Sequence, residues 1–211
     1  MQRFLPVFPL ELVVYPGHSL NLHIFEPRYK QLIADVMEQD SLFGIPPFFD
    51  KRVQEYGTVV KVTNIEKEYD NGELDIRTEG VGIFRVLELL KEVPDKLYSA
   101  AIISDLGEPS FDKVGIFNKV AEMVDELHIS IGYEKPILKE YDSMQSFDLV
   151  KYINLKLDQQ YELLTIKSEA QRQGLILEHL KHIIPSIQEA ESLRSRIQAN
   201  GYFRKEMPPE F

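Results

Sequence analysis

The sequence predicts an α+β protein, with a β-rich first domain and an all-helical second domain. Up to about residue 105 the apolar residues mostly alternate with polar ones, as in half-buried strands, and one helical stripe interrupts them. After Leu106-Gly107-Glu108-Pro109 the apolar residues recur every three or four positions, as in amphipathic helices. We therefore expect a β-rich domain at 1–108, a helical bundle at 109–201 and an irregular tail at 202–211.

The opening stretch, Phe4–Tyr29, predicts two strands, a turn between them and the start of a helix. Pro16-Gly17 is a turn dipeptide, and residues 19–24 alternate apolar and polar side chains, so one face of this strand is expected to be buried. Pro27 suits the first position of a helix. The apolar spacing after it predicts a helix that ends at Gln39-Asp40-Ser41.

The remaining strands of the first half are arranged around a hairpin. Asp70-Asn71-Gly72 supplies residues that tolerate a left-handed turn, between the expected strands 56–69 and 74–78. Gly80 and Gly82 interrupt the second of these, which predicts a bulge or bend and favours a small, bent barrel over a flat sheet. Further strands are expected at Leu42–Phe49, which is short or at an edge because of Pro46-Pro47, at Ile83–Leu89 and at Leu97–Asp105, about six in all.

Helices account for the whole second half. They are expected at 114–127 with Ser110 as N-cap, at Ser146–Leu157 with Ser146 as N-cap, as a short turn at 161–164, and at Ser168–Ala199. Asn200-Gly201 predicts the end of the last one. Pro185 lies inside it, and an interior proline costs about 3 kcal/mol, so this segment is one kinked helix or two helices that break before Pro185. We favour one kinked helix.

Composition excludes several classes of partner and of chemistry. Acidic residues number 34 against 24 Lys and Arg, and the formal net charge of −10 repels phosphate backbones and anionic membrane surfaces. Cysteine is absent, which rules out disulfides, thiolate metal sites and cysteine nucleophiles. No segment has the roughly 18 uninterrupted apolar residues of a membrane span, and the first residues make a poor signal peptide. We expect a cytoplasmic protein without nucleic-acid or membrane partners.

Motifs for catalysis, cofactors and metals are not recognisable. The sequence contains neither the phosphate-binding G-x-x-x-x-G-K-[ST] nor the nucleophile elbow G-x-S-x-G. The positions of His18 and His23 differ by an odd number, so on a strand their side chains point to opposite faces. His179 and His182 lie three apart on a helix without a third ligand, which favours a solvated helix face. We expect no catalytic residue, no cofactor and no metal.

The densest polar motif is Glu26-Pro27-Arg28-Tyr29, with His23 just before it. As a binding site, His23, Glu26 and Arg28 would form a recognition cluster at a groove. As a structural motif, Glu26 would satisfy free N–H groups at the helix start, Arg28 would pair with an acid and Tyr29 would lie in the core. We favour the structural interpretation, because local geometry explains every residue without a ligand.

Two stretches resemble the N-terminal, substrate-binding domain of Lon (La-type) ATP-dependent proteases. They are PVFPLELVVYPGHSLNLHIFEPRYKQLI together with the Phe43-Gly44 pair, and DIRTEGVGIFRVLEL. Tyr15 and Asn21 depart from the usual pattern of the family. The resemblance implies a bent, six-stranded, PUA-like β pseudo-barrel followed by a helical bundle with a long C-terminal helix. It also implies recognition of unfolded or tagged substrates, here by a stand-alone copy without ATPase or protease domains.

Two hypotheses about function follow. The first is a non-catalytic module that binds an unfolded polypeptide or a partner protein through an apolar patch, in protein quality control or as an adaptor. The alternative is a small-molecule-binding protein or small enzyme with a pocket around His23, Glu26 and Arg28, which requires these side chains to converge on an open cavity. The sequence indicates neither the client nor the oligomeric state.

Overall fold

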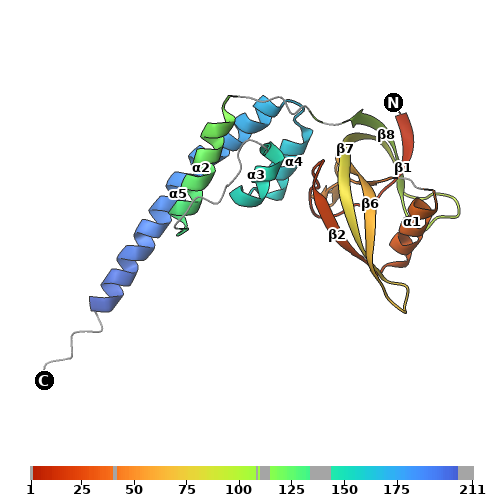
Figure 1. The fold of residues 1–211 in the computed structure, drawn as a ribbon, viewed down its shortest axis with the longest axis horizontal. Coiled ribbons are helices and arrows are strands. Elements are labelled where there is room, and N and C mark those ends of the chain that lie inside the picture. The colour runs from red at the N-terminus through yellow and green to blue at the C-terminus, as the bar shows by residue number, and fades with distance from the viewer. Residues whose placement is uncertain (1, 40–41, 108, 110–114, 134–143, 204–211) are drawn as a thin grey trace, which may run out of the picture. The chain divides into compact units, whose positions relative to one another are not determined.

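The computed structural model describes residues 2–39, 42–107, 109, 115–133 and 144–203 of the chain. The backbone separates into two compact units, which are described one at a time (Figure 1). Met1–Ser110 and Leu155–Lys167 form the first, called here the β unit. Phe111–Asn154 and Ser168–Phe211 form the second, called here the helical unit. The predicted domain boundary at residue 108 stays a prediction, and helix α4 (Leu157–Thr165) groups with the β unit.

Antiparallel strands make up most of the β unit. Within the described residues, one six-stranded sheet contains β1 (Gln2–Pro6), β2 (Ser19–Ile24), β3 (Phe43–Ile45), β6 (Tyr56–Glu68), β7 (Leu74–Leu90) and β8 (Ala100–Gly107). The order is β1-β8-β7-β6-β3, and β2 pairs with β7. A separate hairpin consists of β4 (Phe48–Phe49) and β5 (Arg52–Val53). The predicted α+β fold with six strands is confirmed.

Strand β7 lies at the centre of this sheet, as Figure 1 shows. One edge of its first half pairs with β2, and the same edge of its second half pairs with β8. The opposite edge pairs with β6 along Leu74–Arg85. At Gly80 and Gly82 the register with β6 slips, so Val81 is the extra residue of a bulge. The predicted bend is therefore confirmed, although β7 continues through it as one strand.

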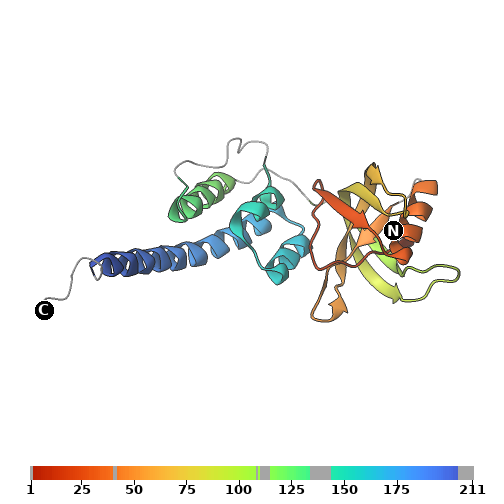
Figure 2. The ribbon, with the colours of Figure 1, turned by 90° about the horizontal axis from the view of Figure 1, so that it is seen from below.

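Helix α1 (Pro27–Glu38) covers the core of the β unit (Figure 2). It starts at Pro27, as predicted, and it buries one apolar face composed of Tyr29, Leu32, Ile33 and Val36. These side chains pack with Phe8, Ile24, Phe43 and Ile76 from the sheet and its connections. A second cluster, around Phe84, lies among β1, β7 and β8 and includes Leu5, Ala101 and Ile103.

Two strand predictions need correction. The expected strand Leu42–Phe49 is split into β3 and β4, because Pro46-Pro47 cannot donate main-chain hydrogen bonds to a ladder. The last strand starts at Ala100 rather than at Leu97. The residues before it contact α1 instead, since the Gln31 side chain accepts the Leu97 N–H at 2.7 Å.

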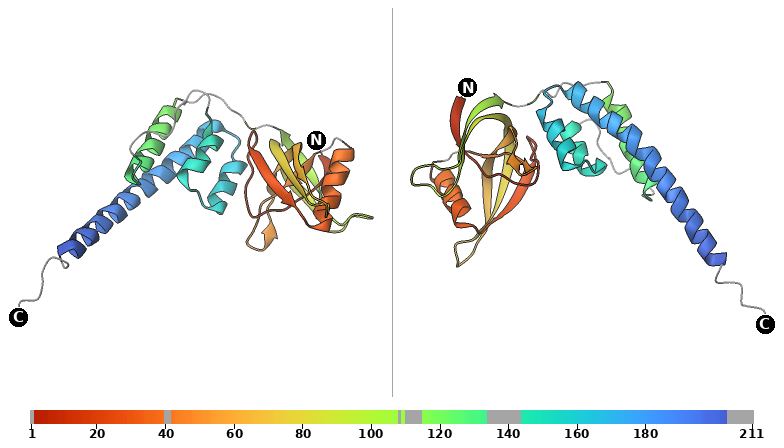
Figure 3. Two further views of the ribbon diagram at one scale, coloured as in Figure 1. Left: turned by 60° about the horizontal axis from the view of Figure 1, so that its bottom comes forward. Right: turned by 180° about the vertical axis from the view of Figure 1, so that it is seen from behind.

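The helical unit contains α2 (Phe117–Ser130), α3 (Ser146–Ile153) and α5 (Glu169–Phe203). Helix α2 lies alongside α5, as both views of Figure 3 show. Helix α5 continues through Pro185, as the preference for one element predicted. The expected stop at Asn200-Gly201 is wrong, because the helix runs on to Phe203. Ser110 and tail residues 204–211 lie outside the described residues.

Helix α3 is shorter than expected and begins differently. Gln145, rather than Ser146, is its N-cap residue, and the Asp148 carboxylate accepts the Gln145 main-chain N–H at 2.8 Å. The helix ends at Ile153, and Asn154 adopts a left-handed conformation with φ 49°. This stop replaces the predicted continuation to Leu157, the residue at which α4 begins.

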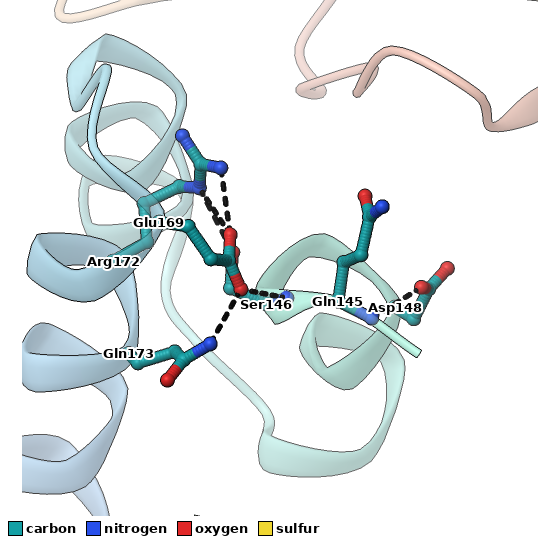
Figure 4. Close-up of polar contacts among 6 residues, drawn as sticks. All are labelled: Gln145, Ser146, Asp148, Glu169, Arg172 and Gln173. Carbon is teal, nitrogen blue, oxygen red and sulfur yellow. Dashed lines mark hydrogen bonds and ion pairs between the residues drawn. The ribbon is translucent and has the colours of Figure 1, made fainter. Parts of the chain in front are cut away.

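A buried polar network joins α3 to the first turn of α5 (Figure 4). The Glu169 carboxylate accepts the main-chain N–H of Ser146 at 3.0 Å and its hydroxyl at 2.8 Å. The fully buried Arg172 donates to the same carboxylate through Nη2 at 2.6 Å, and Gln173 Nε2 donates to it at 2.8 Å. The Arg172 guanidinium also lies over the ring of Phe147, 4.6 Å from its centroid. Glu169 thus serves as an internal anion at the N-terminus of α3.

Candidate functional site

The residues of the predicted polar motif do not form one cluster. His23 on β2 reaches across to β7, with Nδ1 2.7 Å from Asp75 Oδ1 and Nε2 3.3 Å from Glu73 Oε2. The hydrogen bonds from His23 and Tyr69 lower the pKa of Asp75. His23 therefore takes part in a cross-strand polar contact on the exposed surface of the sheet.

Glu26 and Arg28 pair with each other instead. Arg28 Nε donates to Glu26 Oε2 at 2.9 Å, and its guanidinium lies 4.5 Å from the ring centroid of Tyr29. Tyr29 is buried and stacks on Phe8 at a centroid distance of 3.6 Å. Glu26 is the N-cap residue of α1 but makes no side-chain cap hydrogen bond, so the predicted capping role is wrong. The assignment of these residues as a binding motif stays a prediction.

A cleft of about 430 Å³ opens elsewhere on the β unit, between β5, β7 and α4, and we call it the β5–β7 cleft. It is lined by Arg52, Val53, Gln54, Glu55, Val86, Leu89 and Tyr161. Apolar side chains come from both strands, and an aromatic ring comes from the helix. Sequence reasoning did not single out any of these residues as a site.

The β5–β7 cleft lies beyond the point at which β6 stops pairing with β7. The β6–β7 ladder starts at the pair Tyr56 and Arg85, and the Val86 N–H extends it by one hydrogen bond to the Glu55 carbonyl at 2.7 Å. Residues 88–90 pair with β8 on their other edge, and Leu87 is the extra residue of a bulge in that ladder. In the described part of the chain, no strand pairs with them on the edge that β6 leaves. This edge of β7 is therefore open.

Strand β5 presents a second main-chain edge to the same cleft. Asp50 and Lys51 have φ of 52° and 60°, as the two central residues of a type I′ hairpin require. Gln54 donates its N–H to the Pro47 carbonyl at 2.8 Å, so Pro47 and Gln54 form a hydrogen-bonded pair. Hydrogen-bonded and non-hydrogen-bonded pairs alternate along an antiparallel ladder, so the neighbouring pair toward the turn, Phe48 with Val53, is not hydrogen-bonded. The N–H and C=O of Val53 consequently point away from β4.

Helix α4 forms the third wall and is held to the strands by two tyrosines. The Tyr161 hydroxyl accepts the Tyr56 N–H at 3.1 Å, and its ring meets Phe49 edge-on at a centroid distance of 5.5 Å. Tyr15 donates its hydroxyl to the Gln160 carbonyl at 2.9 Å. Burial raises the pKa of Tyr161, so its hydroxyl stays neutral at physiological pH. Tyr161 is thus a fixed, uncharged wall of the cleft.

The charged side chains at the β5–β7 cleft are one ion pair and one arginine. Arg85 donates to Glu55 Oε1 through Nε at 2.5 Å and also through Nη2, and this partner raises the pKa of the arginine. The Glu55 carboxylate is therefore paired with a cation within the protein. Within the described residues, the Arg52 side chain has no ion-pair partner. Among these residues there is also no cluster of three or more metal-ligating side chains.

The described helices include none with the length and apolar character needed to cross a bilayer. The β5–β7 cleft is formed by strands and a short helix, and apolar side chains line it together with the polar side chains of Arg52, Gln54 and Glu55.

Comparisons with known proteins agree with the fold. Cereblon from Xenopus tropicalis is 25% identical over 89 residues, and cereblon from Gallus gallus is 25% identical over 92 residues. These matches cover 40% and 41% of this chain, respectively. They cover only 20% and 21% of the two cereblons, so this chain spans about a fifth of the length of either one. The crystal structure of a Lon N-terminal domain protein from Xanthomonas campestris superposes with a TM-score of 0.68, at 24% identity, over 83% of this chain and 98% of that one.

A match to a family covers most of the chain. Residues 4–182 fit the sequence model of the ATP-dependent protease La (LON) substrate-binding domain. The matched region includes the whole described sheet from Phe4 onward, α1, α4 and every residue that lines the β5–β7 cleft. The chain belongs to the LON substrate-binding domain family.

Proposed function

We propose that this chain is a non-catalytic module that binds extended segments of polypeptide in the β5–β7 cleft. The observation that carries the proposal is the cleft itself, in which Val53, Val86, Leu89 and Tyr161 offer an apolar surface beside an open strand edge. Apolar side chains and main-chain edges recognise polypeptide without an acid, a base or a metal. Membership of a substrate-binding family supports the same function.

The separate contacts of His23 with Asp75 and of Glu26 with Arg28 give no support to a small-molecule pocket around His23, Glu26 and Arg28. Each side chain has a partner within the protein, and none of them lines the β5–β7 cleft. Polypeptide binding therefore accounts better for the chemistry that the surface offers.

The proposal is tested with a cellulose-bound array of unstructured peptides, followed by fluorescence anisotropy of the tightest binders in solution. Leu89→Lys places a charge in the cleft and is expected to weaken binding at least tenfold. Leu97→Lys is the matched control, because Leu97 is 65% exposed in the same unit and lines neither the cleft nor the open edge of β7. Circular dichroism shows whether both variants are folded. Absence of any binding peptide, or equal affinity of both folded variants, would refute the function proposed here.

A further inference from the structure

We propose that the bound segment adds a strand to the open edge of β7, and that it carries an acidic residue opposite Arg52. This inference rests on the proposed function, since it specifies how a polypeptide lies in the β5–β7 cleft. Its ligand class is an extended, proline-free segment with alternating apolar side chains and one carboxylate.

The position proposed for the added strand continues the β6–β7 ladder. The hydrogen bond from Val86 to Glu55 is the last in the ladder, and beyond it the edge of residues 87–90 is vacant in the described part of the chain, while β8 occupies the other edge. Main-chain N–H and C=O groups at such an edge retain their pairing geometry but lack a strand to pair with. An added strand therefore continues an existing ladder and requires no rearrangement of β7.

Val53 provides a second main-chain contact. Its N–H and C=O point away from β4, as the hydrogen bond from Gln54 to Pro47 establishes, and its side chain lines the cleft. In the described residues these two main-chain groups have no hydrogen-bond partner. A segment in the cleft thus meets strand edges from both β5 and β7, which suits an extended main chain better than a helix.

Side-chain selectivity follows from the period of a strand. Successive residues of an added strand point to opposite sides, so every second side chain faces the apolar surface of Val86 and Leu89. The other side chains face solvent. The cleft therefore selects for alternating apolar residues, and it excludes proline, which cannot donate a ladder hydrogen bond.

Charge complementarity supports the acidic residue that we propose in the bound segment. Glu55 is occupied by Arg85, whereas Arg52 is exposed and its guanidinium is without an ion-pair partner among the described residues. The cleft consequently offers an available cation in a protein of net charge −10. A carboxylate on the ligand satisfies it with a charge-assisted, bidentate interaction.

The strand pairing is tested by N-methyl scanning of the tightest peptide from the array. Methylation of one main-chain nitrogen at a time removes a donor without changing the side chain. We expect at least a tenfold loss of affinity at the alternate positions whose N–H groups face β7, because only every second N–H of a strand faces a given neighbour. Between them, we expect a loss only at the residue that faces Val53. A peptide that binds in the cleft but tolerates every N-methylation would overturn the strand pairing and leave the proposed function standing.

The acidic preference is tested by reversing charges. Arg52→Glu is expected to weaken binding of a peptide that contains aspartate about tenfold and to restore binding when lysine replaces that aspartate. Arg194→Glu on α5 is the control, because it changes the net charge equally at a site remote in sequence from the cleft residues. If Arg52→Glu and Arg194→Glu change the affinity equally, long-range charge explains the effect and the role of Arg52 is wrong.

Discussion

Gly17 donates its main-chain N–H to the carbonyl oxygen of Gly80 at 2.8 Å, so the turn that precedes β2 docks on the bend of β7. The Gly80 N–H returns a hydrogen bond of 3.0 Å to the His18 carbonyl. This pair of hydrogen bonds ties the Pro16-Gly17 turn to the bulge. The close approach also leaves no space for a side chain at residue 80.

Gly80→Ala is expected to destabilise the protein strongly. A Cβ at this position would overlap the carbonyl oxygen of Tyr15, which is main chain and cannot rotate away. We expect a loss of about 1–3 kcal/mol in the free energy of unfolding, measured by urea denaturation. Gly82→Ala is the matched control, because its Cβ would meet Gly107 at 3.4 Å or more, an ordinary contact. Equal losses in both variants would contradict this steric origin.

The buried network of the helical unit predicts a large cost when one charge is removed. Arg172→Met leaves the Glu169 carboxylate buried with only Ser146 and Gln173 as donors, so we expect a loss of about 3–5 kcal/mol in stability. Adding Glu169→Gln to this variant is expected to recover part of the loss, since no unpaired charge then remains.

The exposed pair Lys181 and Glu178 provides the control for this network. Both side chains are about half exposed or more, so Lys181→Met is expected to change stability by less than about 0.5 kcal/mol. Thermal and urea unfolding of these variants and of the unaltered protein measures the differences. If the double variant is less stable than Arg172→Met alone, the loss does not come from an unpaired charge.

Lys51→Gly is expected to stabilise the β unit. Lys51 has φ 60°, a left-handed conformation that costs a residue with a side chain about 1–2 kcal/mol and that glycine adopts readily. Glycine also increases the entropy of the unfolded chain, so the expected net gain is roughly 0.5–1 kcal/mol. Lys91→Gly, at a residue without a positive φ, is expected to give no gain. A decrease in the urea midpoint of Lys51→Gly would contradict the prediction.

Local patterns were sufficient to predict the bend of β7 but not the cleft. Gly80 and Gly82 predict the bend because glycine weakens a strand and, inside an alternating pattern, usually marks a bulge or a close backbone approach. The β5–β7 cleft depends on the register of β6 against β7, which stops at Tyr56, and on Tyr161, which contacts that residue from 105 positions further along the chain. Neither the end of a ladder nor such a long-range contact produces a sequence period.

The predicted polar motif shows that residues close in sequence need not form one site. His23 and Glu26 are close in sequence, but His23 lies near the end of β2 and engages Asp75 on β7, whereas Glu26 precedes α1 and pairs with Arg28. Proximity along the chain therefore does not bring these side chains onto one site. The favoured structural interpretation correctly predicted that Tyr29 is buried and that Arg28 pairs with an acid, but it assigned Glu26 a capping role in place of that pairing.

Asp35 on α1 predicts an acid-sensitive contribution to the stability of the β unit. Hydrogen bonds from Lys96 at 2.7 Å and from the Tyr98 hydroxyl at 2.5 Å lower the pKa of its carboxyl group. Because the folded-state pKa lies below the unfolded value of about 3.9, this contribution is present above that pH and is lost as the pH falls through the folded pKa.

Asp35→Asn removes the carboxylate and is therefore expected to cost stability at a pH of about 6 and to cost much less at a pH of about 3. Urea unfolding at both pH values measures the difference, and Asp70→Asn, in the exposed hairpin turn, is the control that should show no such change. Part of the acid sensitivity will persist in Asp35→Asn, since the pKa of Asp75 is also lowered. A stability cost of Asp35→Asn that is the same at both pH values would show that the charge of Asp35 contributes nothing to the stability of the β unit.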